Sequence, residues 1–206
     1  MKTEEKSYYT MSYYEVNNQK EGTYSETYKQ NGKTKLEGNY VKGLKEGIWK
    51  YYNIAGSLVK EETYKNDLLN GPVTEYEQDK IKQIENYLDG EKDGISQKFT
   101  GNGYVAEKQT YKKGKMIARS AYYPGGELKS EMVIPADKNK TYQLKQYFRS
   151  GKPEVLSIMK DDECLKSIQY YESGQIETVH ERVDGEFKLT QKFSPTGEKL
   201  SVTCNC

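Results

Sequence analysis

Residues 47–64 read GIWKYYNIAGSLVKEETY, and this stretch decides the fold. Two runs rich in β-branched and aromatic residues, 47–52 and 57–64, flank a short connection that ends at Gly56. Strand-forming runs on either side of a short glycine-bearing connection are the sequence signal for a β-hairpin. Glycine suits such a turn because it reaches positive φ without a clash from a Cβ atom. The stretch therefore predicts one antiparallel hairpin, with positive φ at Gly56.

The same pattern recurs about every two dozen residues. Eight aromatic residues follow one another in steps of 24, 24, 23, 23, 25, 23 and 23: Tyr28, Tyr52, Tyr76, Phe99, Tyr122, Tyr147, Tyr170 and Phe193. Seven of them are followed four residues later by a glycine: Gly32, Gly56, Gly103, Gly126, Gly151, Gly174 and Gly197. The third copy departs, because Lys80 takes that place beside Asp79. A constant period of this length indicates one small supersecondary unit that is copied and stacked.

A second turn is expected between one copy and the next. Glycine-bearing segments stand at equivalent places in residues 42–47, 66–71 and 89–94. A further aromatic series marks the second strand of each early copy: Tyr40, Tyr64, Tyr87 and Tyr111. No segment carries apolar residues at i, i+3, i+4 and i+7 over the length of a helix. We therefore expect almost no helix and equivalent, inward-facing positions for the eight repeated aromatics.

These residues resemble the MORN repeat, in the bacterial variant found in the YwqK-type antitoxin family. The matching phrases are Tyr28–Lys33, Lys42–Tyr52 and Tyr64–Pro72. The match is strong over residues 21–115 and degenerate over 116–203, where the second-strand tyrosines give way to other residues. The resemblance implies an all-β fold: an elongated, single-layer stack of antiparallel β-hairpins, a MORN-type solenoid of about eight copies of 23–25 residues. The resemblance also implies that the protein functions by binding other molecules rather than by catalysis.

Composition fits a thin repeat sheet better than a globule. Only 34% of the residues are hydrophobic, 31% are charged, and tyrosine occurs 20 times. Tyrosine packs through its ring while its hydroxyl stays in water, which suits a half-exposed sheet. No proline-rich or low-complexity linker interrupts the chain, so we expect one repeat domain over 1–206. Its predicted parts are a partial leading repeat, regular repeats, degenerate repeats and a tail: 1–20, 21–115, 116–203 and 204–206.

The charge balance bears on which classes of partner the protein binds, and the cysteine content bears on its cellular compartment. Lysine and arginine number 32 against 31 acidic residues, so no overall field attracts nucleic acid. No apolar stretch is long enough to span a membrane, and residues 1–6 do not lead into the apolar region of a signal peptide. Removal of a signal peptide ahead of this sequence stays open. The three cysteines, Cys164, Cys204 and Cys206, are too few for a disulfide scaffold and favour a reducing, cytoplasmic setting.

The sequence contains only weak candidates for catalytic and metal-binding residues. His180 lies in IETVHE, residues 176–181, which is typical of an ordinary strand. The acidic run 161–163 lacks the glycine of a calcium loop and stands where a turn between copies is due. Cys204 and Cys206 supply only two ligands, whereas a zinc site needs three or four. We therefore expect no enzyme activity, no cofactor and no metal, and the role of these two cysteines stays open.

One constellation suggests a binding surface. Three successive C-terminal copies carry a second aromatic directly after the repeated one: Tyr123, Phe148 and Tyr171. Neighbouring strand residues point to opposite faces, so these three are expected to line up outward. The first four copies have polar residues there: Lys29, Asn53, Glu77 and Thr100. A row of exposed aromatics is a candidate protein-binding stripe, although a terminal cap, a dimer or a second small core would also cover it.

The sequence thus predicts a non-catalytic protein-binding repeat protein. What the resemblance adds is an antitoxin or immunity-like role, in which the sheet neutralises a partner toxin or effector by covering it. The alternative is a structural scaffold at the cell envelope or in a multiprotein assembly. The chain is expected to be a monomer or to form a heterocomplex with its partner.

Overall fold

A computed structural model describes residues 1–135, 137 and 140–202. The predicted tail with Cys204 and Cys206 lies outside the described residues. All regular structure in the described chain is β-strand, which confirms the predicted all-β stack of antiparallel hairpins. The chain divides into two compact units. Unit 1 is Met1–Gly103 with Tyr111–Lys115, and unit 2 is Tyr104–Thr110 with Met116–Cys206.

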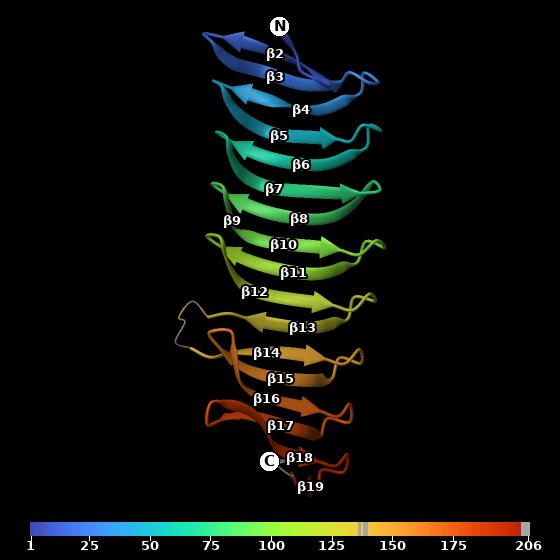
Figure 1. Cartoon of the computed structure of the whole chain (residues 1–206), viewed down its shortest axis with the longest axis vertical. Helices are drawn as coiled ribbons and strands as arrows, with labels where there is room; N and C mark the ends of the chain where they lie inside the picture. The colour runs from blue at the N-terminus through green and yellow to red at the C-terminus, as the bar shows by residue number, and fades with distance from the viewer. Residues whose placement is uncertain (136, 138–139, 203–206) are drawn as a thin grey trace. The chain divides into compact units, whose positions relative to one another are not determined.

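Unit 1 is built from hairpins in which each strand pairs with the next (Figure 1). Every pairing is antiparallel, and β8 pairs with both β9 and β10. The strands are β1 (Lys2–Glu5), β2 (Tyr9–Val16), β3 (Gln19–Tyr28), β4 (Thr34–Val41), β5 (Leu44–Tyr52), β6 (Leu58–Lys65), β7 (Leu68–Glu77), β8 (Lys80–Leu88), β9 (Glu91–Lys92) and β10 (Gly94–Phe99). The strand β11 (Val105–Lys112) gives residues to both units.

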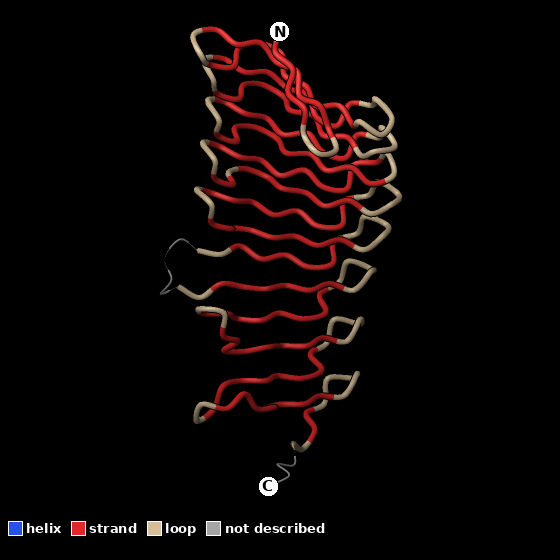
Figure 2. The backbone as a smooth tube through the Cα atoms, turned by 45° about the horizontal axis from the view of Figure 1, so that its top comes forward, coloured by secondary structure: helices blue, strands red, loops and turns tan. Residues whose placement is uncertain are grey.

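Unit 2 continues the same plan with less regular sequence. Its strands pair antiparallel in chain order from β12 to β19. They are β12 (Lys115–Tyr122), β13 (Leu128–Val133), β14 (Tyr142–Tyr147), β15 (Pro153–Lys160), β16 (Glu163–Tyr170), β17 (Ile176–Val183), β18 (Glu186–Phe193) and β19 (Lys199–Leu200). Turns lie at both ends of the strands in each unit, so each unit has two turn edges (Figure 2).

In each unit, one turn edge carries tight turns of two residues. Asn66 and Asp67 have φ values of 51° and 64°, and Asp161 and Asp162 have 48° and 66°. Positive φ at both central residues is the type I′ geometry, which matches the twist of the flanking strands. The acidic run at 161–163 therefore begins in a turn, as the sequence indicated. The same turn geometry explains the missing glycine of the third copy, where Gln78 and Asp79 join β7 to β8.

Successive two-residue turns are hydrogen-bonded to one another in unit 1. In each case the second turn residue donates its backbone N–H to a carbonyl beside the preceding turn: Gly43 to Lys20 at 2.9 Å, Asp67 to Lys45 at 3.1 Å and Gly90 to Leu69 at 2.8 Å. Carboxylates add to this ladder, since Glu21 accepts from the Lys42 N–H at 2.7 Å and Glu46 accepts from the Asn66 N–H at 3.0 Å. Each copy is thus fixed to its neighbour at this edge.

The other turn edge carries the glycine-bearing turns. Gly56 has φ of 90° and Gly174 has φ of 98°, which confirms the positive φ predicted from the sequence. The Gly56 N–H donates to the Asn53 carbonyl at 2.9 Å, and the same bond recurs between Gly174 and Tyr171 at 2.8 Å. The glycines are therefore needed for backbone conformation.

We expect Gly174→Ala to lower the free energy of unfolding by about 1 kcal/mol or more, because alanine resists positive φ. An added Cβ would meet no atom within 4 Å, so the effect isolates backbone strain. Gly101→Ala is the matched control, since that turn glycine lacks positive φ and is equally open. Urea denaturation of both variants checks this. Equal midpoints for the two would show that Gly174 has no conformational role.

The repeated aromatics are all half-buried. One of them occupies a different position in its repeat from the others. A register shift directly precedes Tyr52, and likewise Tyr76, Tyr122, Tyr147 and Tyr170, but in the first copy it precedes Thr27. The turn that follows Tyr28 is one residue longer than the turn that begins at Asn53. Tyr28 is therefore equivalent to Asn53, and its predicted equivalence to Tyr52 is wrong. The longer turn hid the shift, because it keeps the four-residue distance from the aromatic to Gly32.

The core of unit 1 centres on Trp49, the single tryptophan, which is fully buried. Between the pairs Glu37–Lys50 and Asn39–Glu46, three residues of β5 stand opposite Gly38 alone. Gly47 begins this bulge with φ of 71°. The tryptophan ring then covers the backbone of Gly38. Trp49 belongs to one cluster with these apolar and aromatic side chains: Met11, Tyr13, Tyr24, Tyr9, Leu36, Tyr40, Tyr51 and Tyr64.

Candidate protein-binding surface

The structure brings the three predicted binding aromatics to one turn edge of unit 2. Tyr123, Phe148 and Tyr171 are each the first residue of a glycine-bearing turn, directly after β12, β14 and β16. In each turn the aromatic residue donates its backbone N–H to the residue four positions on, at 2.8–2.9 Å. The same turn bonds in all three copies place the three side chains at equivalent positions, as the repeat predicted.

These rings are half-buried rather than freely exposed, which differs from the outward row expected from strand alternation. A register shift stands between Ala121 and Tyr122, and similar shifts precede Tyr147 and Tyr170. A bulge breaks the strict alternation of side chains between faces. Both members of each aromatic pair are consequently partly covered.

Two of the three rings also join adjacent copies. The Tyr123 hydroxyl donates to the Tyr147 carbonyl at 2.9 Å, and the Tyr171 hydroxyl donates to the Phe193 carbonyl at 3.0 Å. Tyr28 makes the same bond to the Tyr52 carbonyl at 2.9 Å in unit 1, so Tyr28 and not Lys29 is the first-copy counterpart of Tyr123, and the expected polar residue there is wrong. Phe148 has no hydroxyl, so it is the one member of the row whose ring makes no such bond.

Basic side chains and an open groove adjoin this aromatic edge. The Arg149 guanidinium and the Lys129 ammonium lie 5.4 and 5.7 Å from the centre of the Tyr123 ring. A groove of about 220 Å³ is lined by apolar, aromatic and polar side chains: Lys145, Gln146, Tyr147, Pro153, Val155, Leu156 and Tyr170. Burial, together with a 2.7 Å hydrogen bond donated to Glu131, raises the pKa of Tyr147 to about 12. Sequence reasoning missed the groove, because its residues come from three strands.

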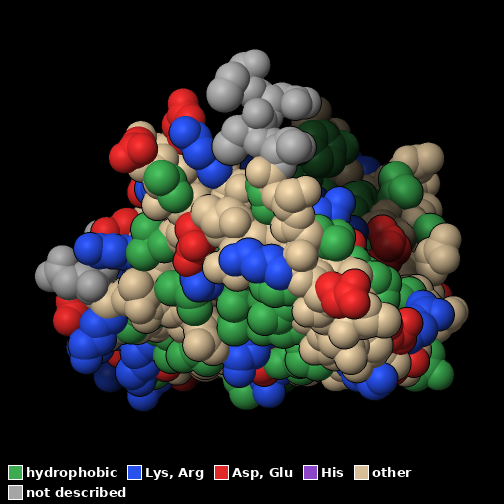
Figure 3. Space-filling view, turned by 90° about the horizontal axis from the view of Figure 1, so that it is seen from below, with side chains coloured by type: hydrophobic (Ala, Val, Ile, Leu, Met, Phe, Trp, Pro, Cys, Tyr) green, Lys and Arg blue, Asp and Glu red, His purple; other side chains and the backbone are tan. Residues whose placement is uncertain are grey.

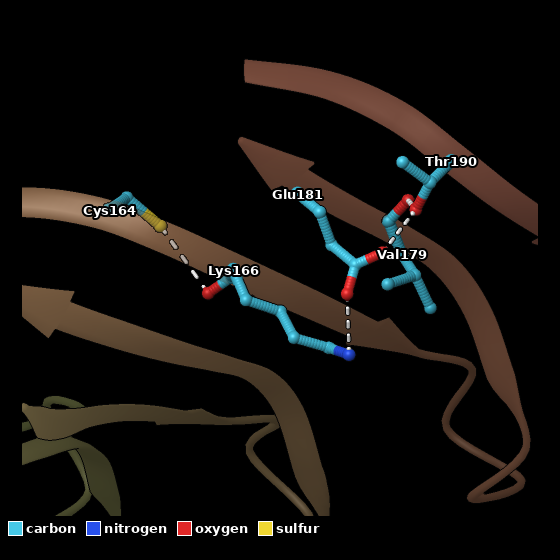
Figure 4. Close-up of polar contacts among 5 residues, drawn as sticks. All are labelled: Cys164, Lys166, Val179, Glu181 and Thr190. Atoms are coloured by element: carbon cyan, nitrogen blue, oxygen red, sulfur yellow. Dashed lines mark hydrogen bonds and ion pairs between the residues drawn. The ribbon is translucent and has the colours of Figure 1, made fainter. Parts of the chain in front are cut away.

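The end of unit 2 holds a polar network that ties strands together (Figure 4). Glu181 accepts a hydrogen bond from Lys166 at 2.8 Å and from the Thr190 hydroxyl at 3.1 Å. These two bonds, the one from Lys166 foremost, hold the pKa of Glu181 below its usual value. The Val179 carbonyl lies at the same 3.1 Å from the Thr190 hydroxyl, which shares its single hydrogen between the two acceptors. The network links β16, β17 and β18, and its role is structural.

His180, which the sequence assigned to an ordinary strand, is a half-buried residue of β17. Its ring stacks on Phe187 with 5.8 Å between centres and 17° between planes. Among the described residues, no group of three His, Cys, Asp or Glu side chains is placed to hold a metal ion. Cys164 makes a weak contact to the Lys166 carbonyl at 3.4 Å (Figure 4).

Unit 1 exposes aliphatic side chains along its two-residue turns, a feature that sequence reasoning did not identify. The exposed residues are Val16, Val41, Leu44, Leu68 and Leu88, with 39–55% of each accessible. They flank four successive turns, so we call them the aliphatic edge. Elsewhere the surface is mixed: seen from below, hydrophobic side chains alternate with charged ones of both signs (Figure 3). Within the described residues, no helix could span a membrane.

One segment of the chain matches a known repeat family. Residues 45–66 match the family model of the MORN repeat variant, which agrees with the observed hairpin and names a repeat family rather than an enzyme family. No curated protein matches the chain. Among solved structures, a mutant of S. aureus TarM in complex with Fondaparinux, alpha-GlcNAc-glycerol and UDP matches with 12% identity and a TM-score of 0.33. That match covers 52% of this chain and 19% of the other.

Proposed function

We propose that this chain works by binding another protein, and that the aromatic edge of unit 2 makes the contact. The aromatic edge is Tyr123, Phe148 and Tyr171. The observation that supports the proposal is their placement at one turn position in three successive copies, with Arg149 and Lys129 beside them. Aromatic and arginine side chains dominate binding hot spots, because they give much contact area with few rotamers to immobilise.

The proposed partner is a toxin or effector that the sheet neutralises by covering it, as an antitoxin or immunity protein would. This finer assignment rests on the resemblance of the repeats to YwqK-type proteins, whereas the match of residues 45–66 to the MORN repeat variant supports only the repeat itself. Neutralisation by coverage needs no chemistry from the chain itself. The proposal places the chain in the cytoplasm, which the low cysteine count favours.

The test begins with affinity purification of the full chain from its native cells and identification of the bound protein. Calorimetry with the purified pair then compares the wild type with Phe148→Ala. We expect this variant to weaken the complex by about 2 kcal/mol, roughly 30-fold in Kd, if the ring is a hot spot. Folding should change little, because Phe148 makes no hydroxyl bond to the next copy.

Matched variants separate binding from folding. Phe187→Ala removes an exposed phenylalanine from the other turn edge of unit 2 and should leave the Kd unchanged. Tyr123→Phe and Tyr171→Phe remove only the hydroxyl bonds between copies, so they should lower stability more than affinity. Wild-type affinity in folded Phe148→Ala would exclude the aromatic edge as the interface.

A growth assay tests the antitoxin role separately. Cells that express the partner alone should stop growing, and co-expression of this chain should restore growth. A harmless partner would contradict neutralisation and favour the alternative, a scaffold in a multiprotein assembly. The aliphatic edge of unit 1 supports that alternative, because it gives the chain a second apolar surface remote in sequence from the first. Substitution of Leu68 and Leu88 by serine would then release a second bound protein.

A further inference from the structure

Two lysine ammonium groups lie on the faces of the aromatic core of unit 1. The Lys20 Nζ lies 5.1, 4.7 and 5.1 Å from the ring centres of Tyr13, Tyr24 and Tyr40. The Lys45 Nζ lies 4.5 Å from the ring centres of both Trp49 and Tyr64. Ring faces attract cations, but they do not neutralise the charge. Each ammonium is thereby held in place with its charge available.

Neither ammonium forms an ion pair with a carboxylate of the described residues. The contrast with Lys92 is informative, because Lys45 and Lys92 stand at the same position after a two-residue turn, opposite Tyr40 and Tyr87. Lys92 also lies over a tyrosine ring, yet its Nζ is 2.6 Å from a carboxylate oxygen of Glu85. The lysines at the aromatic core therefore differ from their repeat equivalent by lacking a carboxylate.

The same cluster holds two further donors without acceptors in the described chain. The Tyr13, Tyr24 and Tyr64 hydroxyls each donate to a glutamate, whereas no hydrogen bond is formed by the half-buried Tyr40 hydroxyl. The Trp49 indole N–H is buried and also lacks a partner. A buried donor without an acceptor is uncommon in folded proteins. The unpaired Tyr40 hydroxyl, by contrast, is reached by solvent and is open to a ligand.

Carboxylates around the cluster are already engaged, and Glu4 and Glu62 accept the Tyr13 and Tyr64 hydroxyls. Asp67 accepts the backbone N–H of Lys45 at 2.6 Å. Glu26 accepts the Tyr24 hydroxyl at 2.8 Å and pairs with Lys35. The face of unit 1 over Trp49 thus presents two fixed cations and a phenol donor that the chain's own acids do not satisfy.

We propose that this face binds an acidic protein segment, with one carboxylate at Lys20 and a second at Lys45. The two lysines belong to adjacent copies, so their spacing is about 9–10 Å, twice the distance between neighbouring strands. An extended chain advances about 3.3 Å per residue, so acidic residues at i and i+3 span that distance. The preferred ligand is therefore an extended segment with acidic residues three apart. This site is independent of the aromatic edge of unit 2 and of any toxin.

Trp49 provides the assay, because it is the only tryptophan and lies directly beneath the Lys45 ammonium. The full chain is titrated with a peptide that carries glutamates at i and i+3, and the tryptophan emission is followed. We expect a saturable change that weakens as salt is added. A peptide with the same composition but adjacent glutamates should bind at least about fivefold more weakly, because only one carboxylate reaches a lysine at a time.

Variants assign the response to the two lysines. Lys20→Met with Lys45→Met keeps an unbranched side chain over the rings and should weaken peptide binding at least about tenfold, because both cationic partners of the carboxylates are lost. Lys92→Met is the matched control and should bind as the wild type does. If the double methionine variant fails to fold by circular dichroism, Lys20→Arg with Lys45→Arg replaces it and should retain binding.

Three results would overturn the proposal. The first is a peptide titration with neither an emission change nor heat in calorimetry. The second is equal loss of binding in Lys92→Met. The third is saturable binding of inorganic phosphate without binding of the peptide, which would make the cluster a site for a free anion instead.

Discussion

Trp49→Ala should lower the free energy of unfolding of unit 1 by about 3–5 kcal/mol, the usual range for a buried tryptophan truncated to alanine. The ring is fully buried, and it contacts Tyr24, Tyr40 and Tyr64 with centres 5.5, 5.0 and 6.3 Å away. Its removal leaves a cavity at the point where those rings converge. Since the variant has no tryptophan, urea denaturation is followed by circular dichroism.

Ile48→Ala is the control for this truncation. Ile48 is the residue before Trp49 in β5, but 56% of it is exposed, so little buried surface is lost. We expect its urea midpoint to stay close to that of the wild type. Similar midpoints for the two alanine variants would mean that the aromatic cluster does not hold unit 1 together.

Gly38→Ala should be the most damaging substitution of a glycine. The added Cβ would lie 2.3 Å from Trp49 Cδ2, far inside normal contact distance, so the tryptophan ring or the strand has to move. Overpacking of this kind costs about 1–3 kcal/mol and sometimes more. Gly125→Ala is the control, because its Cβ would approach only the mobile end of Glu127, at 2.5 Å. The emission of Trp49 should shift in Gly38→Ala and stay unchanged in Gly125→Ala.

A double-mutant cycle decides whether the clash is the cause. On the Trp49→Ala background the added Cβ meets empty space, so Gly38→Ala should be nearly neutral there. Residues in direct contact show coupling energies of about 0.5–3 kcal/mol. Additive effects of the two substitutions would contradict the contact between the Gly38 backbone and the tryptophan ring.

The hairpins and their glycines could be predicted from the sequence because turn chemistry is local. Gly56 and Gly174 have the positive φ that a short glycine-bearing connection requires. The frame of the first copy could not be predicted, since the shift from Tyr28 to Thr27 depends on a bulge and on one extra turn residue. Neither feature can be recognised from the spacing of 24 residues between Tyr28 and Tyr52, which equals the next step of the series.

The candidate site was predicted in part, for a related reason. The repeat predicted one equivalent position for Tyr123, Phe148 and Tyr171, and their equivalent turn bonds agree with that, but it did not predict that this position lies in a turn. Their burial was not predicted, because the argument assumed strict alternation through a bulge. The positions of Lys20 and Lys45 could not be predicted, because a lysine near a turn is normally solvated and the sequence does not show that its ammonium lies over an aromatic ring.

The hydrogen-bonded ladder of two-residue turns has a consequence for how such a chain changes in length. Every copy in unit 1 is attached to the one before it by the same bonds, from Gly43 to Lys20 and from Asp67 to Lys45. Duplication or loss of a whole copy regenerates these bonds at the new junction, whereas insertion of a single turn residue breaks them. Genes for such chains can therefore grow and shrink in steps of one repeat, and natural variants should differ by whole copies.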